Sequence, residues 1–254
     1  MTIAACESVA RVGFRSSSHR LRRASRLVPC YHKHVDLRGR FITFEGTDGS
    51  GKSTQIEKLA NALRAQHIKV LLTREPGGTP LGESIRHTLL DSATHNLSPQ
   101  TELALMFAAR SQHLRQIILP TLATGEYVLC DRFTDSSEAY QGGGRELGSE
   151  AVLTLHRLLC DNFQPDLTIL LDCDLTVSLA RAKHRNLITH ATAHIDENRF
   201  EQEGLAFFGR VHDAFLAIAR REPKRVSLID ARDTPAATHA KVLEAVRDRL
   251  KIAL

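Results

Sequence analysis

The sequence predicts an α/β fold in which five parallel strands form one sheet with helices on both of its faces. From Phe41 onward, short apolar or β-branched runs alternate with longer stretches of helical periodicity, and this alternation is typical of parallel sheets. Two of the runs, residues 127–130 and 167–171, are almost continuously apolar, as expected of strands that are buried on both faces. A glycine-rich turn after the first run supports the same class of fold.

The elements follow one another along the chain in a regular order. Strands are expected at Phe41–Glu45, Val70–Thr73, Tyr127–Cys130, Leu167–Leu171 and Val226–Ile229. Helices are expected at Lys52–His67, about Leu81–Leu90, about Pro99–Ala123 and from about Pro235 onward. Another helical face is predicted by spacings close to multiples of 3.6 between Phe200, Phe207, Phe208, Val211, Phe215 and Ile218. No internal repeat is evident, so residues 39–254 are expected to form one domain.

Composition limits the classes of protein to consider. Of the 254 residues, 42% are hydrophobic and 25% are charged, which is ordinary for a soluble enzyme. No apolar run approaches the length of a membrane span, so no membrane partner is expected. The five cysteines include no CxxC pair, which argues against a cysteine metal site and favours reduced thiols in the cytoplasm.

The formal net charge of +5 is concentrated at one end of the chain. Residues 1–40 contain nine Arg or Lys and two acids, so the rest of the chain is close to −2 and lacks the basic footprint of a nucleic-acid-binding protein. Residues 1–38 are rich in Arg and Ser and poor in acids, which is typical of a transit peptide. A disordered extension or a start codon placed too far upstream is the preferred explanation. A cytoplasmic location is therefore expected, with an organelle as the alternative.

The segment Gly46–Ser53 (GTDGSGKS) matches the P-loop pattern GxxxxGK[ST] and lies between an expected strand and an expected helix. Its glycines let backbone N–H groups turn toward phosphate oxygens, and the helix N-terminus adds a favourable potential. Lys52 would contact the β- and γ-phosphates of ATP, and Ser53 would ligate Mg²⁺. The sequence thus predicts a P-loop NTPase fold whose ATP-binding residues are Gly46, Thr47, Asp48, Gly49, Ser50, Gly51, Lys52, Ser53 and Thr54.

Two arginines follow neighbouring strands and indicate an acceptor site. Arg74 belongs to the segment TREPGGT after the second strand, and Arg132 belongs to DRF after the third. Because parallel strands end at one edge of the sheet, both guanidinium groups are expected to hold one phosphate in line with the γ-phosphate. Asp131 would act near Mg²⁺. The alternatives are a solvated arginine in a surface loop, and a simple ion pair between Asp131 and Arg132.

Five segments in the same order closely resemble the bacterial thymidylate kinase family. They are GTDGSGKS, TREPGGT, Met106–Arg110 (MFAAR), DRF and Ala139–Arg145 (AYQGGGR), and the resemblance extends from about Phe41 to the last helix. It implies in-line transfer of the γ-phosphate of MgATP to dTMP in dTTP biosynthesis, without a covalent intermediate, and a homodimer. The alternatives are a kinase of another nucleoside monophosphate or deoxynucleoside and, more distantly, a nucleic-acid-binding or regulatory ATPase.

The resemblance also implies roles by position. Arg74 and Arg132 would grip the dTMP phosphate, and Arg110 would contact a thymine carbonyl. Asp48 would lie near the deoxyribose and orient the reacting groups. The other expected substrate contacts are Glu75, Pro76, Gly77, Ser136, Ser137, Tyr140 and Gln141. The family's thymine-stacking phenylalanine corresponds to Met106, while Phe107 lies one residue nearer to Arg110, and on a helix either side chain could reach the base.

A segment near residues 181–199 resembles the mobile lid that closes over ATP in this family. Gly49 stands where some members carry a P-loop arginine, so the resemblance implies that lid arginines neutralise the transferring phosphoryl group. The candidates are Arg181, Arg185 and Arg199, and the alternative is an ordinary basic helix end. The residues expected to be catalytic are Asp48, Lys52, Arg132, Arg181 and Arg185.

The expected lid departs from the family pattern in its length. Thirteen residues separate Arg185 from Arg199, where the family usually has only a few. His190 and His194 have the spacing of a helical metal pair, but no third ligand is evident, so a solvated, longer loop is expected. Asn198 stands where an aspartate is common.

Overall fold

The structure is a computed structural model that describes residues 39–91, 94, 97–193, 199–252 and 254. The basic extension expected at residues 1–38 lies outside the described residues. So do His194 and Asn198 of the segment expected to form a lid.

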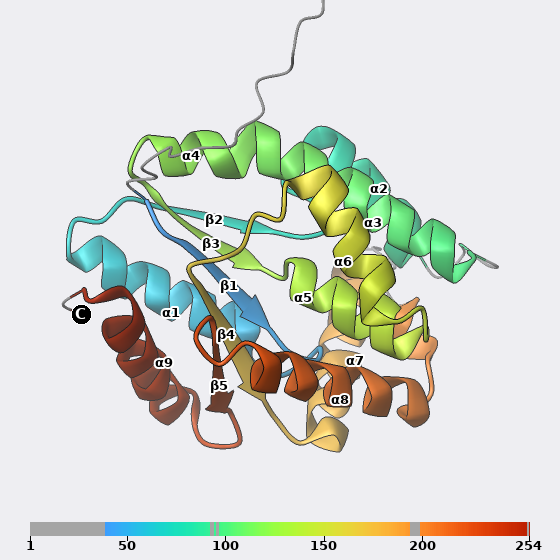
Figure 1. Cartoon of the computed structure of the whole chain (residues 1–254). Helices are drawn as coiled ribbons and strands as arrows, with labels where there is room; N and C mark the ends of the chain where they lie inside the picture. The colour runs from blue at the N-terminus through green and yellow to red at the C-terminus, as the bar shows by residue number, and fades with distance from the viewer. Residues whose placement is uncertain (1–38, 92–93, 95–96, 194–198, 253) are drawn as a thin grey trace, which may run out of the picture. The chain divides into compact units, whose positions relative to one another are not determined.

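The described part of the chain is built on one five-stranded sheet, as the sequence predicts. Its strands lie in the order β2-β3-β1-β4-β5, and every neighbouring pair is parallel. Figure 1 shows the five arrows pointing toward the same side of the molecule. The strands are β1 (Phe41–Glu45), β2 (Val70–Arg74), β3 (Tyr127–Asp131), β4 (Leu167–Asp172) and β5 (Val226–Asp230). Each expected strand is therefore present, and its N-terminal boundary is the predicted one.

Two helices cover one face of the sheet. These are α1 (Lys52–Ala65) and α9 (Pro235–Leu250), which lie side by side in Figure 1. Their apolar side chains, including Leu59 and Val242, pack against strand residues such as Ile42 and Phe44 in one buried cluster. Burial of this apolar area is the main contribution to the stability of a two-layer core.

The opposite face is covered by a larger group of helices. Residues of α3 (Pro99–His113), α4 (Leu119–Ala123) and α6 (Ser149–Cys160) pack against β1 and β3 through Phe41, Val128 and Cys130. A third buried cluster joins β4 and β5 to α8 (Leu205–Arg221). The remaining elements are α2 (Pro80–Leu90), η1 (Leu114–Ile118), α5 (Thr134–Ser137), η2 (Glu138–Gly144), α7 (Leu175–Ala193) and η3 (Phe200–Gln202).

Local sequence signals explain where several helices begin. The side chains of Thr79, Ser98 and Thr234 accept hydrogen bonds from backbone N–H groups in the first turns of α2, α3 and α9. A proline follows each of them, and proline is favoured at the first helical position because the missing N–H would have no partner there. These three boundaries agree with the sequence-based expectation to within one residue.

Four expectations about helices need correction. Residues 186–193, expected to lie in a solvated loop after Arg185, belong to α7, which ends at Ala193. The long helix expected at Pro99–Ala123 contains a π-helical segment, η1, between α3 and α4. Phe200 does not share a helix with the other five apolar residues, because α8 begins at Leu205, although all six belong to one buried cluster. The helix expected to end at His67 ends at Ala65, where a turn leads into β2.

None of the helices in the described residues is long and apolar enough to cross a membrane. Cys130, Cys160 and Cys173 are buried and form no disulfide, in line with the expectation of reduced thiols for the cysteines that the structure describes.

Candidate functional site

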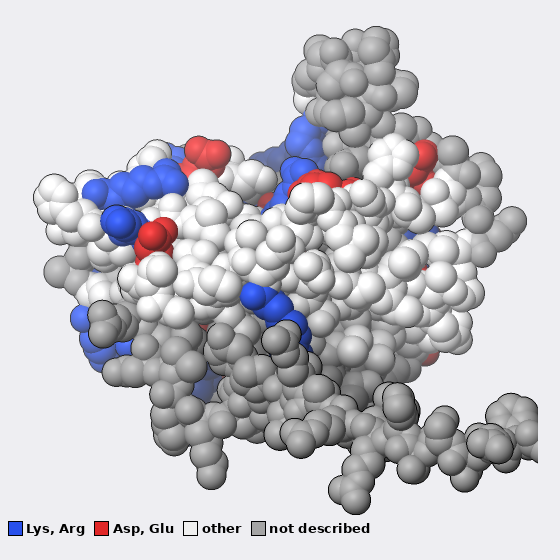
Figure 2. Space-filling model, turned by 90° about the horizontal axis from the view of Figure 1, so that it is seen from above, with Lys and Arg blue, Asp and Glu red and all other residues white. Residues whose placement is uncertain are grey.

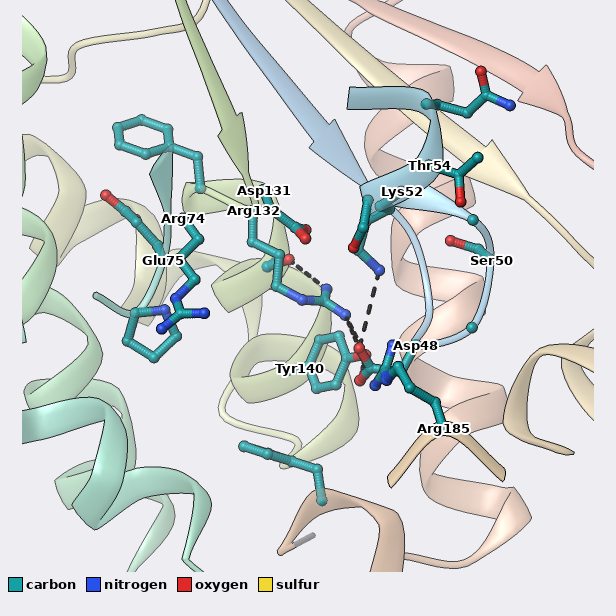
Figure 3. A pocket seen from close by; sticks show the side chains of 18 of the residues that line it. Asp48, Ser50, Lys52, Thr54, Arg74, Glu75, Asp131, Arg132, Tyr140 and Arg185 are labelled. Carbon is teal, nitrogen blue, oxygen red and sulfur yellow. Dashed lines mark hydrogen bonds and ion pairs between the residues drawn. The ribbon is translucent and has the colours of Figure 1, made fainter. Parts of the chain in front are cut away.

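A cavity of about 780 Å³ lies at the carboxyl ends of the strands, where an open parallel sheet usually binds its ligands. Most of the expected site residues line it. Gly46, Thr47, Gly77 and Arg199 are not among the described residues that do, and the carbonyl oxygens of Gly46 and Thr47 accept hydrogen bonds from Lys52. The lining ones are Asp48, Gly49, Ser50, Gly51, Lys52, Ser53, Thr54, Arg74, Glu75, Pro76, Arg110, Asp131, Arg132, Ser136, Ser137, Tyr140, Gln141, Arg181 and Arg185. Segments far apart in sequence thus meet in one hollow (Figure 3).

Lys52 is held against the glycine-rich turn between β1 and α1. Its Nζ donates to Gly46 O at 3.0 Å and to Thr47 O at 2.9 Å, and it lies 4.0 Å from a carboxylate oxygen of Asp48. Burial, together with the nearby Arg132 cation, lowers the pKa of Lys52 to about 8. An ammonium group beside inward-facing backbone N–H groups is suited to polyphosphate.

Gly49 brings the turn into close contact with α7. Its φ is +81°, and a Cβ atom there would lie 1.9 Å from Ser178 O of α7. Thr47 Oγ1 also donates to Ser178 Oγ at 3.2 Å. A side chain at position 49 therefore does not fit beside α7. Arg181 and Arg185, one and two turns further along this helix, line the cavity instead.

Arg132 connects the glycine-rich turn with α5 and η2. Its guanidinium group donates to Asp48 Oδ1 and Ser136 Oγ at 2.8 Å and to Tyr140 OH at 3.2 Å (Figure 3). The Arg132 backbone has a φ of 73°, in the left-handed region that residues other than glycine rarely adopt. Burial opposes ionisation of Asp48, but the Arg132 and Lys52 cations outweigh it and hold the pKa of this carboxyl well below its usual value.

The carboxylate partner of Arg132 is therefore Asp48, rather than the adjacent Asp131 that the alternative interpretation named. Oδ1 of Asp131 is buried and has no hydrogen-bond partner among the described residues. Asp131 lines the cavity together with the exposed Ser53 at the start of α1. A carboxylate and a hydroxyl group fit Mg²⁺, which usually keeps water and substrate phosphates as its other ligands. The described residues contain no group of three or more His, Cys, Asp or Glu that would hold a metal by themselves.

Arg74 approaches the same space from the end of β2. Figure 3 shows Arg74 and Arg132 extending into one hollow, with Lys52 beyond Arg132. The Arg74 side chain is 53% exposed, and its Nη2 donates to Glu83 Oε2 of α2 at 3.0 Å. Its guanidinium group is thus largely hydrated and has one exposed protein partner.

Arg110 forms a buried end of the cavity and is only 2% exposed. Its Nε donates to Glu75 Oε2 at 2.6 Å, and its Nη2 donates to Phe133 O and Ser137 Oγ, both at 3.0 Å. Its Nη1 is buried and has no partner among the described residues. Because a buried guanidinium N–H without an acceptor is costly, this atom is a strong candidate for contact with a ligand oxygen.

Glu75 lies behind Arg110 and uses both carboxylate oxygens within the protein. Oε2 accepts from Arg110, and Oε1 lies 2.9 Å from Nδ1 of His113, which is fully buried. The Arg110 and His113 partners outweigh burial and lower the pKa of Glu75. Gly78 packs so closely on His113 that a Cβ atom would lie 2.4 Å from its Nε2. The sequence analysis did not identify His113, although its position three residues after Arg110 on one helix was an available signal.

The two candidates for stacking on a base occupy different environments. Phe107 is fully buried in the core, with its ring centroid 4.7 Å from the Arg110 guanidinium carbon. Met106 is half-buried and lines the cavity, as does Phe200 of η3. Of the two neighbours in α3, Met106 is therefore the one that a ligand in this cavity would meet.

Comparison with known proteins shows the family of this chain. The family model described as thymidylate kinase matches residues 44–242. The chain belongs to the thymidylate kinase family. The thymidylate kinase of Trichlorobacter lovleyi is 47% identical over 212 residues, which cover 84% of this chain and 99% of that one. That of Pseudomonas syringae pv. tomato is 46% identical over 216 residues, covering 85% and 99%. The crystal structure of thymidylate kinase from Ehrlichia chaffeensis is 34% identical, covers 82% of this chain and 98% of that one, and superposes with a TM-score of 0.66.

Two features of this thymidylate kinase family member lie outside the sequence-based expectations. The loop after β5 contributes Ala231 and Asp233 to the cavity wall, and the first turn of α9 contributes Pro235 and Thr238. The rule that ligands meet the carboxyl ends of parallel strands could have found them. Arg199 was expected among the lid arginines. Its guanidinium group instead contacts Glu102 Oε2 and Leu89 O, and it is not among the described residues that line the cavity.

Proposed function

We propose that this chain transfers the γ-phosphoryl group of ATP to dTMP, giving dTDP and ADP, in nucleotide biosynthesis. The observation that carries the proposal is that Arg74 and Arg132 line the same cavity as Lys52 and the glycine-rich turn. Two guanidinium groups opposite a polyphosphate-binding turn suit an acceptor monophosphate placed in line with the donor. Membership of the thymidylate kinase family supports the same reaction.

The donor half of the site would be formed by the turn and by α7. Backbone N–H groups of the turn and the Lys52 ammonium group would hold the β- and γ-phosphates, while Arg181 and Arg185 would approach from α7. Ser53 and Asp131 would hold Mg²⁺. When bound, the ion supplies charge neutralisation on the phosphate oxygens. Positioning and charge stabilisation account for most of phosphoryl-transfer catalysis, so no covalent intermediate on the protein is needed.

The acceptor half would recognise the nucleoside at the buried end. Arg110 Nη1, which lacks a partner among the described residues, would donate to a thymine carbonyl, with Ser137 beside it. Met106 would contact the base, and Tyr140 would lie over the nucleoside. Asp48, held ionised by Arg132 and Lys52, would orient the sugar and the phosphates rather than remove a proton, since a phosphate monoester is already largely ionised at neutral pH.

An acceptor panel tests this function. ADP release is measured with dTMP, dUMP, dCMP, dGMP or thymidine as the only acceptor, and dTMP is expected to give the largest kcat/KM. A larger kcat/KM for another nucleotide would identify that nucleotide, instead of dTMP, as the acceptor. ATP turnover that is equally fast without any acceptor would contradict the kinase function. Repeating the panel without Mg²⁺ is expected to abolish turnover.

We also propose that the enzyme acts as a homodimer. Leu81 of α2 and Leu158 of α6 are 52% and 71% exposed, and both helices pack on α3. Figure 2, which views the side with α2, α3 and α4, shows a broad area without charged side chains. Exposed leucines and an area of surface without charged side chains each favour a protein contact. Light scattering coupled to gel filtration measures the mass directly, and Leu158→Glu is expected to shift it toward the monomer. A cytoplasmic location remains a prediction from the cysteines and from the preferred explanation of residues 1–38. The lack of a nucleic-acid partner remains a prediction from the charge distribution of the sequence.

A further inference from the structure

Glu102 is a charged residue in the core that neither the motifs nor the proposed reaction use. It lies in the first turn of α3 and is fully buried. Oε1 accepts from Gln141 Nε2 at 2.8 Å and from Arg145 Nε at 3.3 Å. Oε2 accepts from Arg199 Nη2 at 2.6 Å and lies 3.2 Å from Arg145 Nη2. One carboxylate therefore joins η2 to the segment that begins at Arg199.

These contacts determine how the Gln141 amide is oriented. A side-chain amide has a donor end and an acceptor end, and its hydrogen-bond network decides which end points where. Arginine has donors only, so the two guanidinium groups require both Glu102 oxygens to act as acceptors. The Gln141 group that faces Glu102 must then be the NH₂ group. Oε1 is left on the opposite side of the amide.

Gln141 Oε1 is turned away from Glu102 and receives no hydrogen bond from the part of the chain that the structure describes. Gln141 is 1% exposed, its Oε1 has no hydrogen-bond partner among the described residues, and the residue lines the cavity. A buried carbonyl oxygen in this position needs a donor, because leaving it unpaired costs free energy. A ligand that supplies an N–H or O–H group there would satisfy it.

We propose that Glu102 is a positioning residue that makes Gln141 an obligate hydrogen-bond acceptor, so that the site selects nucleotides with a donor at this point. The inference rests on the proposed function, in which the cavity holds a nucleoside monophosphate. On dTMP the donor is either the N3–H of the base or the 3′-hydroxyl of the sugar. The same carboxylate holds Arg145 and Arg199, whose guanidinium carbons lie 5.5 Å and 4.6 Å from the centroid of the Phe200 ring on the cavity wall.

The principal test is Glu102→Gln, which gives position 102 an NH₂ group and allows the Gln141 amide to turn over. Steady-state kinetics are measured with dTMP, with 3′-deoxy-dTMP and with N3-methyl-dTMP. We expect KM for dTMP to rise about tenfold, the size of one lost buried hydrogen bond, with kcat nearly unchanged. In the wild type, the analogue that lacks the donor should have a lower kcat/KM than dTMP, and we call this ratio the penalty on the analogue. In Glu102→Gln the penalty on one of the two analogues should shrink by the same factor, and that analogue identifies the donor.

Glu138→Gln is the matched control. Glu138 is also a buried carboxylate, and it pairs with both terminal nitrogens of Arg221 at 2.6 and 2.8 Å, but it is not among the described residues lining the cavity. Both variants should lower Tm. Only Glu102→Gln should change KM for dTMP and the analogue penalty. Equal KM changes in the two variants would overturn the proposal, because they would reflect a general loss of stability.

A second variant keeps the proposal testable if Glu102→Gln does not fold. Gln141→Leu removes the acceptor and leaves the pairs between Glu102 and the two arginines intact. It should abolish the penalty on the same single analogue. If it keeps the full wild-type penalties on both analogues, the proposal is wrong. Failure of the wild-type enzyme to phosphorylate dTMP would instead contradict the proposed function, so the two failures are distinguishable.

Discussion

In the proposed acceptor site, the arginine assigned to the nucleoside end and the arginine assigned to the phosphate end are held in opposite ways. Arg110, at the nucleoside end, is 2% exposed and has three acceptors in place. Arg74, at the phosphate end, is 53% exposed and contacts one exposed carboxylate. The buried arginine is oriented when the protein folds, so binding a base requires little further ordering. The exposed arginine must lose water and side-chain freedom when it meets a phosphate. Substitution of Arg110 should therefore lower the stability of the protein, whereas substitution of Arg74 should mainly weaken ligand binding.

Arg132 lies between Arg74 and Lys52 (Figure 3), and its replacement should have the largest effect. It contacts the carboxylate of Asp48 and two hydroxyl groups, and it lines the cavity beside Lys52. Arg132→Ala should lower kcat/KM for dTMP by about a thousandfold, because a preorganised charge next to the transferred group is lost. A loss below tenfold, measured in a variant that keeps the wild-type Tm, would exclude a direct role in catalysis.

Arg110→Ala should combine a binding defect with a stability defect. It leaves the buried Glu75 without its main cationic partner, and breaking a buried ion pair in this way costs about 3–5 kcal/mol. Urea unfolding measures that loss. At temperatures where the variant is folded, kcat/KM for dTMP should fall about a hundredfold. Normal stability together with reduced affinity would contradict the preorganised arrangement.

Arg74→Ala should weaken dTMP binding with little loss of stability, in contrast to Arg110→Ala. Its partner Glu83 is 46% exposed, so loss of the pair should change the free energy of unfolding by less than about 0.5 kcal/mol. KM for dTMP should rise about tenfold, through the loss of one charge-assisted contact to phosphate. High salt should weaken dTMP binding to the wild type more than to the variant. A salt response equal in both proteins would argue against contact between Arg74 and the phosphate.

The pH dependence of kcat/KM for ATP should reveal the titration of Lys52. Burial lowers its pKa to about 8, so the free enzyme loses this cation as the pH rises through 8. The value of kcat/KM for ATP should fall by about tenfold for each pH unit well above that point. Lys52→Arg stays charged in this range, and its lower activity should show no such decline. An identical decline in both proteins would mean that another group titrates.

The last prediction concerns stability rather than activity, at Glu45, which is buried at the end of β1 with Phe133 N and Ser136 Oγ as its partners. Burial, with a contribution from Asp135, raises the pKa of Glu45 to about 8. The folded protein therefore keeps a proton that the unfolded chain loses above about pH 4.5, so stability falls as the pH rises from 4.5 through 8. Glu45→Gln should make Tm less dependent on pH over this interval. An equal slope of Tm against pH in both proteins would show that Glu45 of the folded wild type is ionised throughout this interval.

The positions of the strands and of the phosphate-binding turn could be predicted because their signals are local. Residues 41–45 and 127–130 are apolar over the length of a strand, and GTDGSGKS carries its own conformational preferences. Arg74 and Arg132 could be placed together because parallel strands end at one edge of the sheet. The glycine-rich segment of η2 carried no helical signal, and its π-helical conformation is accompanied by packing against α8.

Other residues of the site could not be predicted because their partners are distant in sequence. Glu102 contacts residues 39 and 97 positions away, and His113 meets Glu75 at a distance of 38 positions. In the sequence, a single buried glutamate or histidine within a helix looks the same as one that is exposed to solvent. The choice between Met106 and Phe107 was also open, because one step along a helix turns a side chain by about 100° and both lay within one turn of Arg110.

The sequence alone determined the order of strands and helices along the chain, the glycine-rich turn and the two arginines at the ends of β2 and β3, since each depends on neighbouring residues or on a general rule for parallel sheets. Only the tertiary structure decided that Arg132 binds Asp48, that Arg110 leaves one N–H free of protein partners among the described residues, and that Glu102 turns the carbonyl of Gln141 away from itself. The physical reason is that the energies of buried charges and hydrogen bonds depend on which groups meet after the chain has packed.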